Sequence, residues 1–233
     1  MISDAPLPYS AVLFDLDGTI ADSAPGITST LAYTLETLGL PVPAPARLLE
    51  WVGPPLPESF TEKLGLTGPA LDEAMQVYRA RYLERGALDS RVFPGMEEVL
   101  RLVHEAGIPT SLATSKPERP ATYMLDHFGL SRYLDVITGA SDDEVRSAKK
   151  DVVEEALIRL AARGVDLSRP VLVGDRHHDV DGATAHGVPT IFVEWGYGGV
   201  EEQAGAVAVA RDTDGLLDLL GLPAESGARA ATT

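Results

Sequence analysis

The chain has 233 residues, 45% hydrophobic and 23% charged, a balance typical of globular rather than disordered proteins. Its formal net charge of −16 argues against nucleic acid and anionic membranes as partners, because long-range repulsion would oppose binding. The absence of cysteine excludes disulfides, zinc–thiolate sites and thiol catalysis. The sequence opens without a basic, apolar leader and contains no apolar run long enough to span a bilayer, so we expect a cytoplasmic protein, either a monomer or a homodimer.

The first predicted element is a buried strand, Val12–Phe14, which ends in an acidic turn. The next segment, from Asp22 to about Arg91, has apolar residues at helical spacing and no convincing strand. Within it, Trp51 and Tyr78 are expected to pack the core of a helical unit. Helices are expected at 25–39, 47–51, 56–64 and 71–85.

After Phe93-Pro94-Gly95 the pattern changes to alternating helices and strands. Helices are expected at 96–107, 117–127, 149–162 and 180–186, and strands at 109–113, 136–138, 171–173 and 190–193. Such alternation is typical of an α/β fold with a doubly wound, Rossmann-like parallel sheet. The tail from about Glu225 is expected to be frayed, because it is rich in small and polar residues.

These patterns predict two domains. A small all-helical domain at 23–91 is inserted after the first strand, and residues 1–22 and 92–233 form the α/β core. In open sheets of this kind ligands bind beyond the carboxyl ends of the strands, which is where chemistry is expected.

Polar residues do collect at the predicted strand ends. Asp15 and Asp17 follow the first strand, where two neighbouring buried acids are costly unless a cation shares the site. Thr114 and Ser115 precede a helix whose free N–H groups attract an anion. Asp175 ends a later strand.

The run Asp15-Leu16-Asp17-Gly18-Thr19 resembles the first motif of the haloacid dehalogenase-like hydrolases. Thr114, a lysine before the long helix, and the pair Asp175 and Asp179 follow in the order of that family's other motifs. Three further segments are most similar to the phosphoglycolate phosphatase-like branch and to its 5′-nucleotidase members: Trp51–Leu56, Arg146–Val152 and Gly174–Asp179. The helical insertion matches the mobile cap domain of that branch.

The resemblance implies that Asp15 is the nucleophile and Asp17 the general acid and base. It also implies Mg²⁺, held by Asp15, the backbone carbonyl of Asp17, Asp175 and Asp179. Carboxylate and carbonyl oxygens are the ligands that Mg²⁺ prefers.

The resemblance further implies that Thr114, Ser115 and Lys149 hold the phosphoryl oxygens. Lys149 fits the family spacing after Arg146 better than Lys150 does.

Several other residues carry weaker expectations. Gly53, in a loop of the helical insertion, is a candidate substrate contact, and so is Lys116, although a surface charge is the preferred interpretation of this lysine. His177 and His178 are not expected to bind the metal, because the family's metal shell is made of oxygens, and their role stays open. The run Gly196-Tyr197-Gly198-Gly199 lacks the spacing of a dinucleotide-binding turn.

We therefore expect a Mg²⁺-dependent phosphomonoester hydrolase that forms an aspartyl-phosphate. Its substrate is expected to be a small phosphorylated metabolite, either phosphoglycolate or a nucleoside monophosphate. A phosphosugar mutase and a pyrophosphatase of the same fold are alternatives, and a non-catalytic phosphometabolite-binding protein is a further one. Haloacid dehalogenase activity is disfavoured, because Asp17 and the metal aspartates serve phosphate chemistry.

Overall fold

The computed structural model describes residues 7–141 and 145–222. Its main sheet has six strands in the order β5-β4-β1-β6-β7-β8, and every pairing is parallel. The strands are β1 (Ala11–Phe14), β4 (Thr110–Pro117), β5 (Val136–Ala140), β6 (Pro170–Gly174), β7 (Thr190–Val193) and β8 (Ala208–Ala210). The predicted doubly wound α/β fold is confirmed. The tail beyond Glu225, predicted to be frayed, lies outside the described residues.

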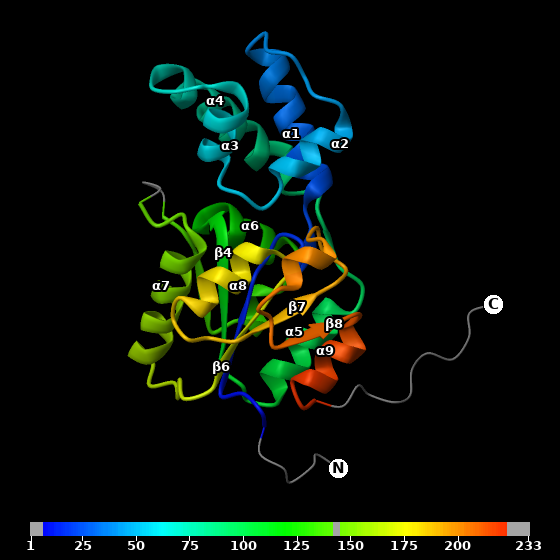
Figure 1. The fold of residues 1–233 in the computed structure, drawn as a ribbon, viewed down its shortest axis with the longest axis vertical. Coiled ribbons are helices and arrows are strands. Elements are labelled where there is room, and N and C mark those ends of the chain that lie inside the picture. The colour runs from blue at the N-terminus through cyan, green and yellow to red at the C-terminus, as the bar shows by residue number, and fades with distance from the viewer. Residues whose placement is uncertain (1–6, 142–144, 223–233) are drawn as a thin grey trace, which may run out of the picture.

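Helices cover both faces of this sheet (Figure 1). One face carries α5 (Met96–Glu105), α6 (Glu118–His127) and α9 (Thr213–Leu219), and the other carries α7 (Lys149–Ala162) and α8 (His177–Thr184). Side chains alternate along β1, so Val12 and Phe14 pack toward the first face and Ala11 and Leu13 toward the second. Both sides of the strand are therefore buried, as its continuous apolar run predicts.

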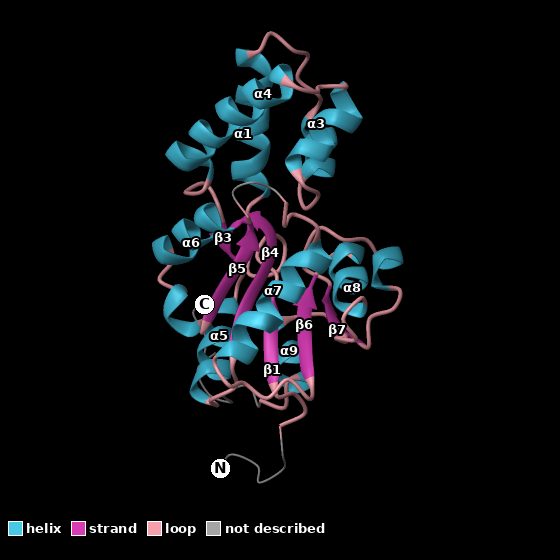
Figure 2. Cartoon of the chain, turned by 90° about the vertical axis from the view of Figure 1, so that its left-hand side faces the viewer, coloured by secondary structure: helices cyan, strands magenta, loops and turns pink. Residues whose placement is uncertain are grey.

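A separate group of helices lies beyond the carboxyl ends of the strands, and the strand arrows point toward it in Figure 2. This helical layer consists of α1 (Ala24–Thr37), α2 (Pro45–Leu48), η1 (Leu49–Trp51), α3 (Leu56–Leu64), α4 (Pro69–Arg81) and η2 (Tyr82–Gly86). It has its own apolar cluster, which includes Trp51 and Tyr78 as expected. The Trp51 ring meets Phe60 edge-on, with ring centroids 5.3 Å apart.

Two short strands connect the helical layer to the sheet. β2 (Ala21–Asp22) and β3 (Arg91–Val92) pair in antiparallel fashion at the two points where the chain crosses between the two parts. The prediction of no strand between Asp22 and Arg91 is therefore wrong at both ends of that segment. Strands of two residues are too short to show an alternating pattern, and for the same reason the three-residue β8 was not predicted.

Some boundaries also differ from the prediction. α8 begins at His177 rather than near Val180, and β4 continues to Pro117, so that α6 begins one residue later. Among the residues that the structure covers, none of the helices combines the length and the apolar character needed to cross a bilayer.

Candidate active site

Three carboxylates meet at the carboxyl ends of two neighbouring strands. Asp15 follows β1, Asp175 follows β6, and Asp179 lies in the first turn of α8. Because β1 and β6 pair in parallel, their ends lie at the same edge of the sheet. One carboxylate oxygen of each residue lies within 4.8 Å of the others, and all three residues are buried. The structure thus brings together three of the residues predicted to hold a metal.

Lys149, the first residue of α7, reaches into this cluster. Its Nζ lies 2.6 Å from Asp15 Oδ1 and 2.6 Å from Asp179 Oδ1, and it donates a hydrogen bond of 2.9 Å to the carbonyl of Ala113. The lysine is buried, whereas Lys150 is exposed. Of the two candidate lysines, the fold brings Lys149 to the cluster.

Burial dominates the electrostatics of the cluster. It raises the pKa of Asp15 to about 6, against the attraction of Lys149. Burial and repulsion from Asp179 raise the pKa of Asp175 well above its ordinary value. Burial opposes the charge on Lys149, yet Asp15 and Asp179 outweigh it and raise the lysine's pKa. A cluster with an excess of carboxylates and only oxygen donors fits a hard divalent cation such as Mg²⁺.

Asp175 is oriented by groups from two loops. Its Oδ1 accepts a hydrogen bond from Thr19 Oγ1 at 3.2 Å, and its Oδ2 accepts one from the Tyr197 N–H at 2.7 Å. Both loops approach closely: a Cβ at Gly18, where φ is +91°, or at Gly196 would lie within 2.4 Å of Asp175 Oδ2. The Gly-rich run after β7 therefore packs against a carboxylate of the site. Sequence reasoning missed this role, although glycines at a strand's carboxyl end were a usable signal.

Asp17 stands apart from the carboxylate cluster and pairs with Lys116. The Nζ of Lys116 lies 2.9 Å from both carboxylate oxygens of Asp17 and 4.7 Å from the centre of the Tyr82 ring. The preferred interpretation of Lys116 as a surface charge is wrong, since its side chain is only 6% exposed. The reason is that β4 continues past Lys116 to Pro117 and carries the lysine beneath η2. Burial opposes its charge, but Asp17 and Tyr82 together outweigh burial and raise its pKa.

A small cavity of about 20 Å³ unites these groups. It is lined by every predicted site residue except Asp175, namely Asp15, Asp17, Gly53, Thr114, Ser115, Lys116, Lys149 and Asp179. Arg176 and His178 line it as well; no role was expected of Arg176, and that of His178 was left open. Burial and the neighbouring His177 lower the pKa of His178.

Arg176 connects the carboxyl edge of the sheet to the helical layer. Its Nη1 donates a hydrogen bond of 2.8 Å to the carbonyl of Val52, and its Nε lies 2.9 Å from Glu202 Oε2. A Cβ at Gly53 would lie only 3.0 Å from the same Nη1. Glycine at this position therefore allows the loop to approach Arg176 closely. His177 pairs with Glu202 at 2.7 Å and is half-exposed, so its ring is directed away from the carboxylate cluster.

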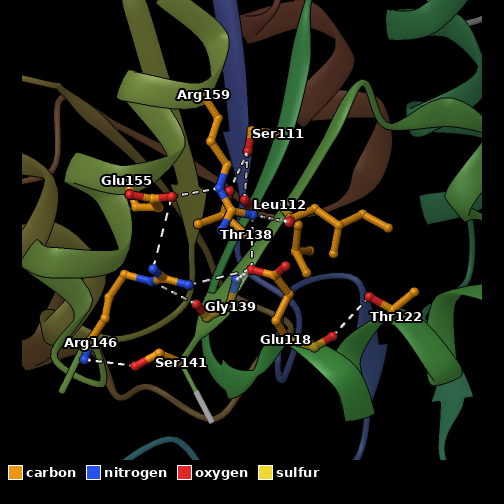
Figure 3. Close-up of polar contacts among 11 residues, drawn as sticks. Ser111, Leu112, Glu118, Thr122, Thr138, Gly139, Ser141, Arg146, Glu155 and Arg159 are labelled. Atoms are coloured by element: carbon orange, nitrogen blue, oxygen red, sulfur yellow. Dashed lines mark hydrogen bonds and ion pairs between the residues drawn. The ribbon is translucent and has the colours of Figure 1, made fainter. Parts of the chain in front are cut away.

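A charged network joins α7 to the elements beside it (Figure 3). Arg159 donates to Glu118 at 2.9 Å and to Glu155 at 2.7 Å, while Arg146 lies 3.5 Å from Glu118 and 3.9 Å from Glu155. Two arginines and two glutamates thereby join α6, α7 and the loop between β5 and α7. The ion pairs of this network involve neither Lys149 nor the carboxylate cluster.

Comparison with known proteins identifies the same family that the sequence motifs resemble. Residues 12–193 match the family model described as haloacid dehalogenase-like hydrolase. The 5′-nucleotidase of Pseudomonas aeruginosa is 36% identical over 199 residues, which are 85% of this chain and 89% of that protein. The phosphoglycolate phosphatase of Rhodospirillum rubrum is 35% identical over 96% of this chain and 95% of its own.

A third relative carries a different name. The tyrosine-protein kinase PtkA of Mycobacterium tuberculosis is 44% identical over 187 residues, or 80% of this chain. The match covers 62% of PtkA, so this chain spans less than two thirds of that protein's length. The solved structure of PtkA superposes with a TM-score of 0.79 and 41% identity, covering 92% of this chain and 99% of the solved one.

Proposed function

The chain belongs to the haloacid dehalogenase-like hydrolase family, and from this premise we propose that it is a phosphatase, namely a Mg²⁺-dependent phosphomonoester hydrolase that forms an aspartyl-phosphate. Its substrate is a small phosphorylated metabolite. The observation that carries the proposal is the buried cluster of Asp15, Asp175 and Asp179 with Lys149 at its edge. This arrangement supplies a carboxylate nucleophile, oxygen ligands for a cation, and a positive charge for a phosphoryl oxygen.

Asp15 is the nucleophile in this proposal. Lys149 holds its Oδ1, and among the described residues no hydrogen bond is made to Oδ2, which leaves that oxygen to attack phosphorus. A bond forms between Oδ2 and phosphorus while the bond from phosphorus to the alcohol oxygen breaks. An ionised carboxylate needs no base to activate it. Lys149 also limits rotation of the carboxylate, so that the attacking oxygen stays directed into the small cavity.

Asp17 is the general acid and base in this proposal. As the alcohol leaves, the protonated form of Asp17 gives the alcohol oxygen a proton, and in the second half-reaction the resulting carboxylate takes a proton from the water that attacks the aspartyl-phosphate. Such catalysis contributes on the order of 10²–10⁴ in rate. Lys116, bonded to both oxygens of Asp17, holds the carboxylate until substrate arrives.

The remaining cavity residues bind the phosphoryl group. Thr114, Ser115 and Lys149 donate to its oxygens, where negative charge spreads in the transition state. Asp15, Asp175, Asp179 and the backbone carbonyl of Asp17 would hold Mg²⁺, which supplies Lewis-acid stabilisation of the phosphate charge.

The helical layer, residues 23–91, is a cap in this proposal. A cavity of about 20 Å³ has room for about one water molecule and not for a phosphoryl group. Gly53 of the layer and Arg176 of the core both line it. Substrate entry therefore requires the cap loop to move away, and closure afterwards excludes water.

The test is phosphate release from a panel of phosphomonoesters, with Mg²⁺ and with EDTA. The panel holds 2-phosphoglycolate, nucleoside 5′-monophosphates, sugar phosphates and pyrophosphate. Metal-dependent release from monoesters supports the proposal. Release from pyrophosphate alone identifies a pyrophosphatase. Interconversion of sugar phosphates that depends on glucose 1,6-bisphosphate identifies a mutase. No turnover in either assay contradicts a hydrolase and favours a phosphometabolite-binding protein.

Phosphoryl transfer to a tyrosine hydroxyl is a second candidate, favoured by the 44% identity with PtkA. In that reaction a phosphate donor would phosphorylate Asp15, and a phenol rather than water would accept the group. Incubation with ATP and tyrosine peptides tests this directly. Labelled phosphotyrosine supports the kinase reaction, whereas release of inorganic phosphate without labelled peptide excludes it for these peptides.

A further inference from the structure

A second, larger cavity of about 270 Å³ lies between the helical layer and the sheet. The rings of Tyr78 and Tyr82, from α4 and η2, line it on the helical side, and Pro117 and Pro120 line it on the sheet side. The two tyrosine rings are stacked, with centroids 5.7 Å apart and planes inclined by 12°. The cavity therefore presents flat, largely apolar walls.

A third space of about 80 Å³ shares lining residues with both cavities. It shares Asp17 and Ser115 with the small cavity and Met75 with the large one, and Lys116 lines all three. The Nζ of Lys116 lies 2.9 Å from the Asp17 carboxylate and 4.7 Å from the centre of the Tyr82 ring. The Lys116 ammonium group therefore lies between the Tyr82 ring and the proposed general acid. The leaving group departs on the side of Asp17 and thus toward these spaces.

We propose that the large cavity receives a planar ring carried by the leaving group, and that the 80 Å³ space receives the linker between this ring and the phosphate. A nucleoside monophosphate, with its ribose as linker and its base as ring, has this form. The inference rests on the proposed function and specifies its substrate class. Stacking on aromatic side chains is the interaction that nucleobases make regardless of their identity.

The charges around the cavities agree with this assignment. A leaving group with its own carboxylate, such as glycolate, needs a cation, but Lys116, Lys149 and Arg176 each already pair with a carboxylate. The large cavity is different, because Arg119 at its rim is exposed and has no ion pair within the described part of the chain. This guanidinium is available to acceptor atoms on the edge of a base.

The first test compares substrates that differ only in the ring. Nucleoside 5′-monophosphates and ribose 5-phosphate share the sugar phosphate, so their ratio of kcat/KM isolates the base. We expect an advantage of about tenfold or more for the nucleotides. Equal values would overturn the inference. Benzyl phosphate is an ester of a primary alcohol, as the nucleotides are, but carries its ring without a ribose linker and should match ribose 5-phosphate; a rate equal to that of the nucleotides would overturn the assignment of the middle space.

The second test fills the large cavity. Leu83 lines it, whereas Leu88 lies nearby in the chain, is 41% exposed and does not line it. Leu83→Trp should remove the nucleotide advantage and leave kcat/KM for ribose 5-phosphate unchanged, while Leu88→Trp should change neither. An undiminished nucleotide advantage in a folded Leu83→Trp variant would overturn the inference.

A binding measurement separates this inference from the proposed function. Calorimetry of adenosine against the wild-type protein needs no phosphate chemistry, and we expect a heat of binding that Leu83→Trp abolishes and Leu88→Trp retains. Hydrolysis of ribose 5-phosphate without adenosine binding would leave the phosphatase proposal intact and overturn the ring site. Adenosine binding without hydrolysis of any substrate would support the ring site and contradict the hydrolase.

Discussion

The guanidinium of Arg176 donates a hydrogen bond to the backbone carbonyl of Val52 at 2.8 Å across a separation of 124 residues. Arg176 directly follows Asp175 of the carboxylate cluster, while Val52 belongs to the helical layer. This contact therefore links the edge of the sheet that holds the carboxylate cluster to the loop above it. The Nε of the same guanidinium lies 2.9 Å from Glu202 Oε2.

Arg176→Lys should weaken this link. Lysine keeps the charge but lacks the planar fork that reaches Val52 and Glu202 together. We expect kcat/KM to fall about tenfold, because a charged hydrogen bond is worth roughly one to three kcal/mol. Amide exchange in 52–64 should become faster. Arg211→Lys is the control, since that side chain is 87% exposed; unchanged exchange in the Arg176 variant would contradict the link.

Glu202 makes the protein sensitive to acid. Burial opposes its ionisation, but hydrogen bonds from Arg176 and His177 outweigh burial and lower its pKa to about 2. Its ionised form thus stabilises the fold above the ordinary value of 4.5, and this contribution is lost as pH falls from there toward 2. Glu202→Gln should lower stability at pH 7 by on the order of 1 kcal/mol, with a smaller difference at pH 3. Thermal melts at both pH values test this, with the exposed neighbour Glu201→Gln as control.

Asp15→Asn should abolish turnover, since an amide oxygen is a poor nucleophile. We expect a loss of at least about a thousandfold in kcat with the fold retained, measured by phosphate release and circular dichroism. The variant should also fail to form the covalent adduct that acid quenching traps from the wild type. Asp72→Asn, on the exposed side of α4, should behave like the wild type. Adduct formation by a folded Asp15→Asn protein would mean that another residue is the nucleophile.

Stability without metal should fall as pH rises through about 6. The folded pKa of Asp15 is about 6, above its ordinary value of 3.8, so protonation stabilises the fold at low pH and this contribution is lost above pH 6. A divalent cation needs the ionised carboxylates. The rise in melting temperature on adding Mg²⁺ should therefore be larger at pH 7.5 than at pH 5, and Asp175→Asn should remove most of it. An equal rise at both pH values would argue against these carboxylates as ligands.

Tyr197→Phe should loosen the crossing between the sheet and the helical layer. The Tyr197 hydroxyl accepts hydrogen bonds from the N–H groups of Ser23 and Ala24 and donates one of 2.9 Å to Asp22. Its removal leaves these groups without their partner and should cost about 1–3 kcal/mol in the free energy of unfolding. Urea titration measures the change. Tyr123→Phe, with an exposed ring, should cost nothing; an equally small effect at Tyr197 would contradict the argument.

Local sequence patterns were sufficient for five of the six strands of the sheet and for much of the candidate site. Asp15, Thr114 and Asp175 each follow an apolar run, and in a parallel sheet the carboxyl ends of such runs meet at one edge. Placing these residues together requires only the strand ends and the parallel topology, both of which depend on patterns over a few neighbouring residues. Lys149 came instead from the family resemblance, through its spacing after Arg146; it begins the helix that follows β5.

The tertiary structure alone decided which side chains pair across these ends. Lys116 is buried because η2, far away in sequence, covers it, and nothing next to Lys116 in the chain predicts Tyr82 above its ammonium group. The contacts of Arg176 with Val52 and of Tyr197 with Asp22 likewise join segments whose approach depends on how the helical layer packs over the sheet. Sequence patterns over a few residues determine where strands and helices end, whereas contacts between distant side chains depend on the packing of the whole chain.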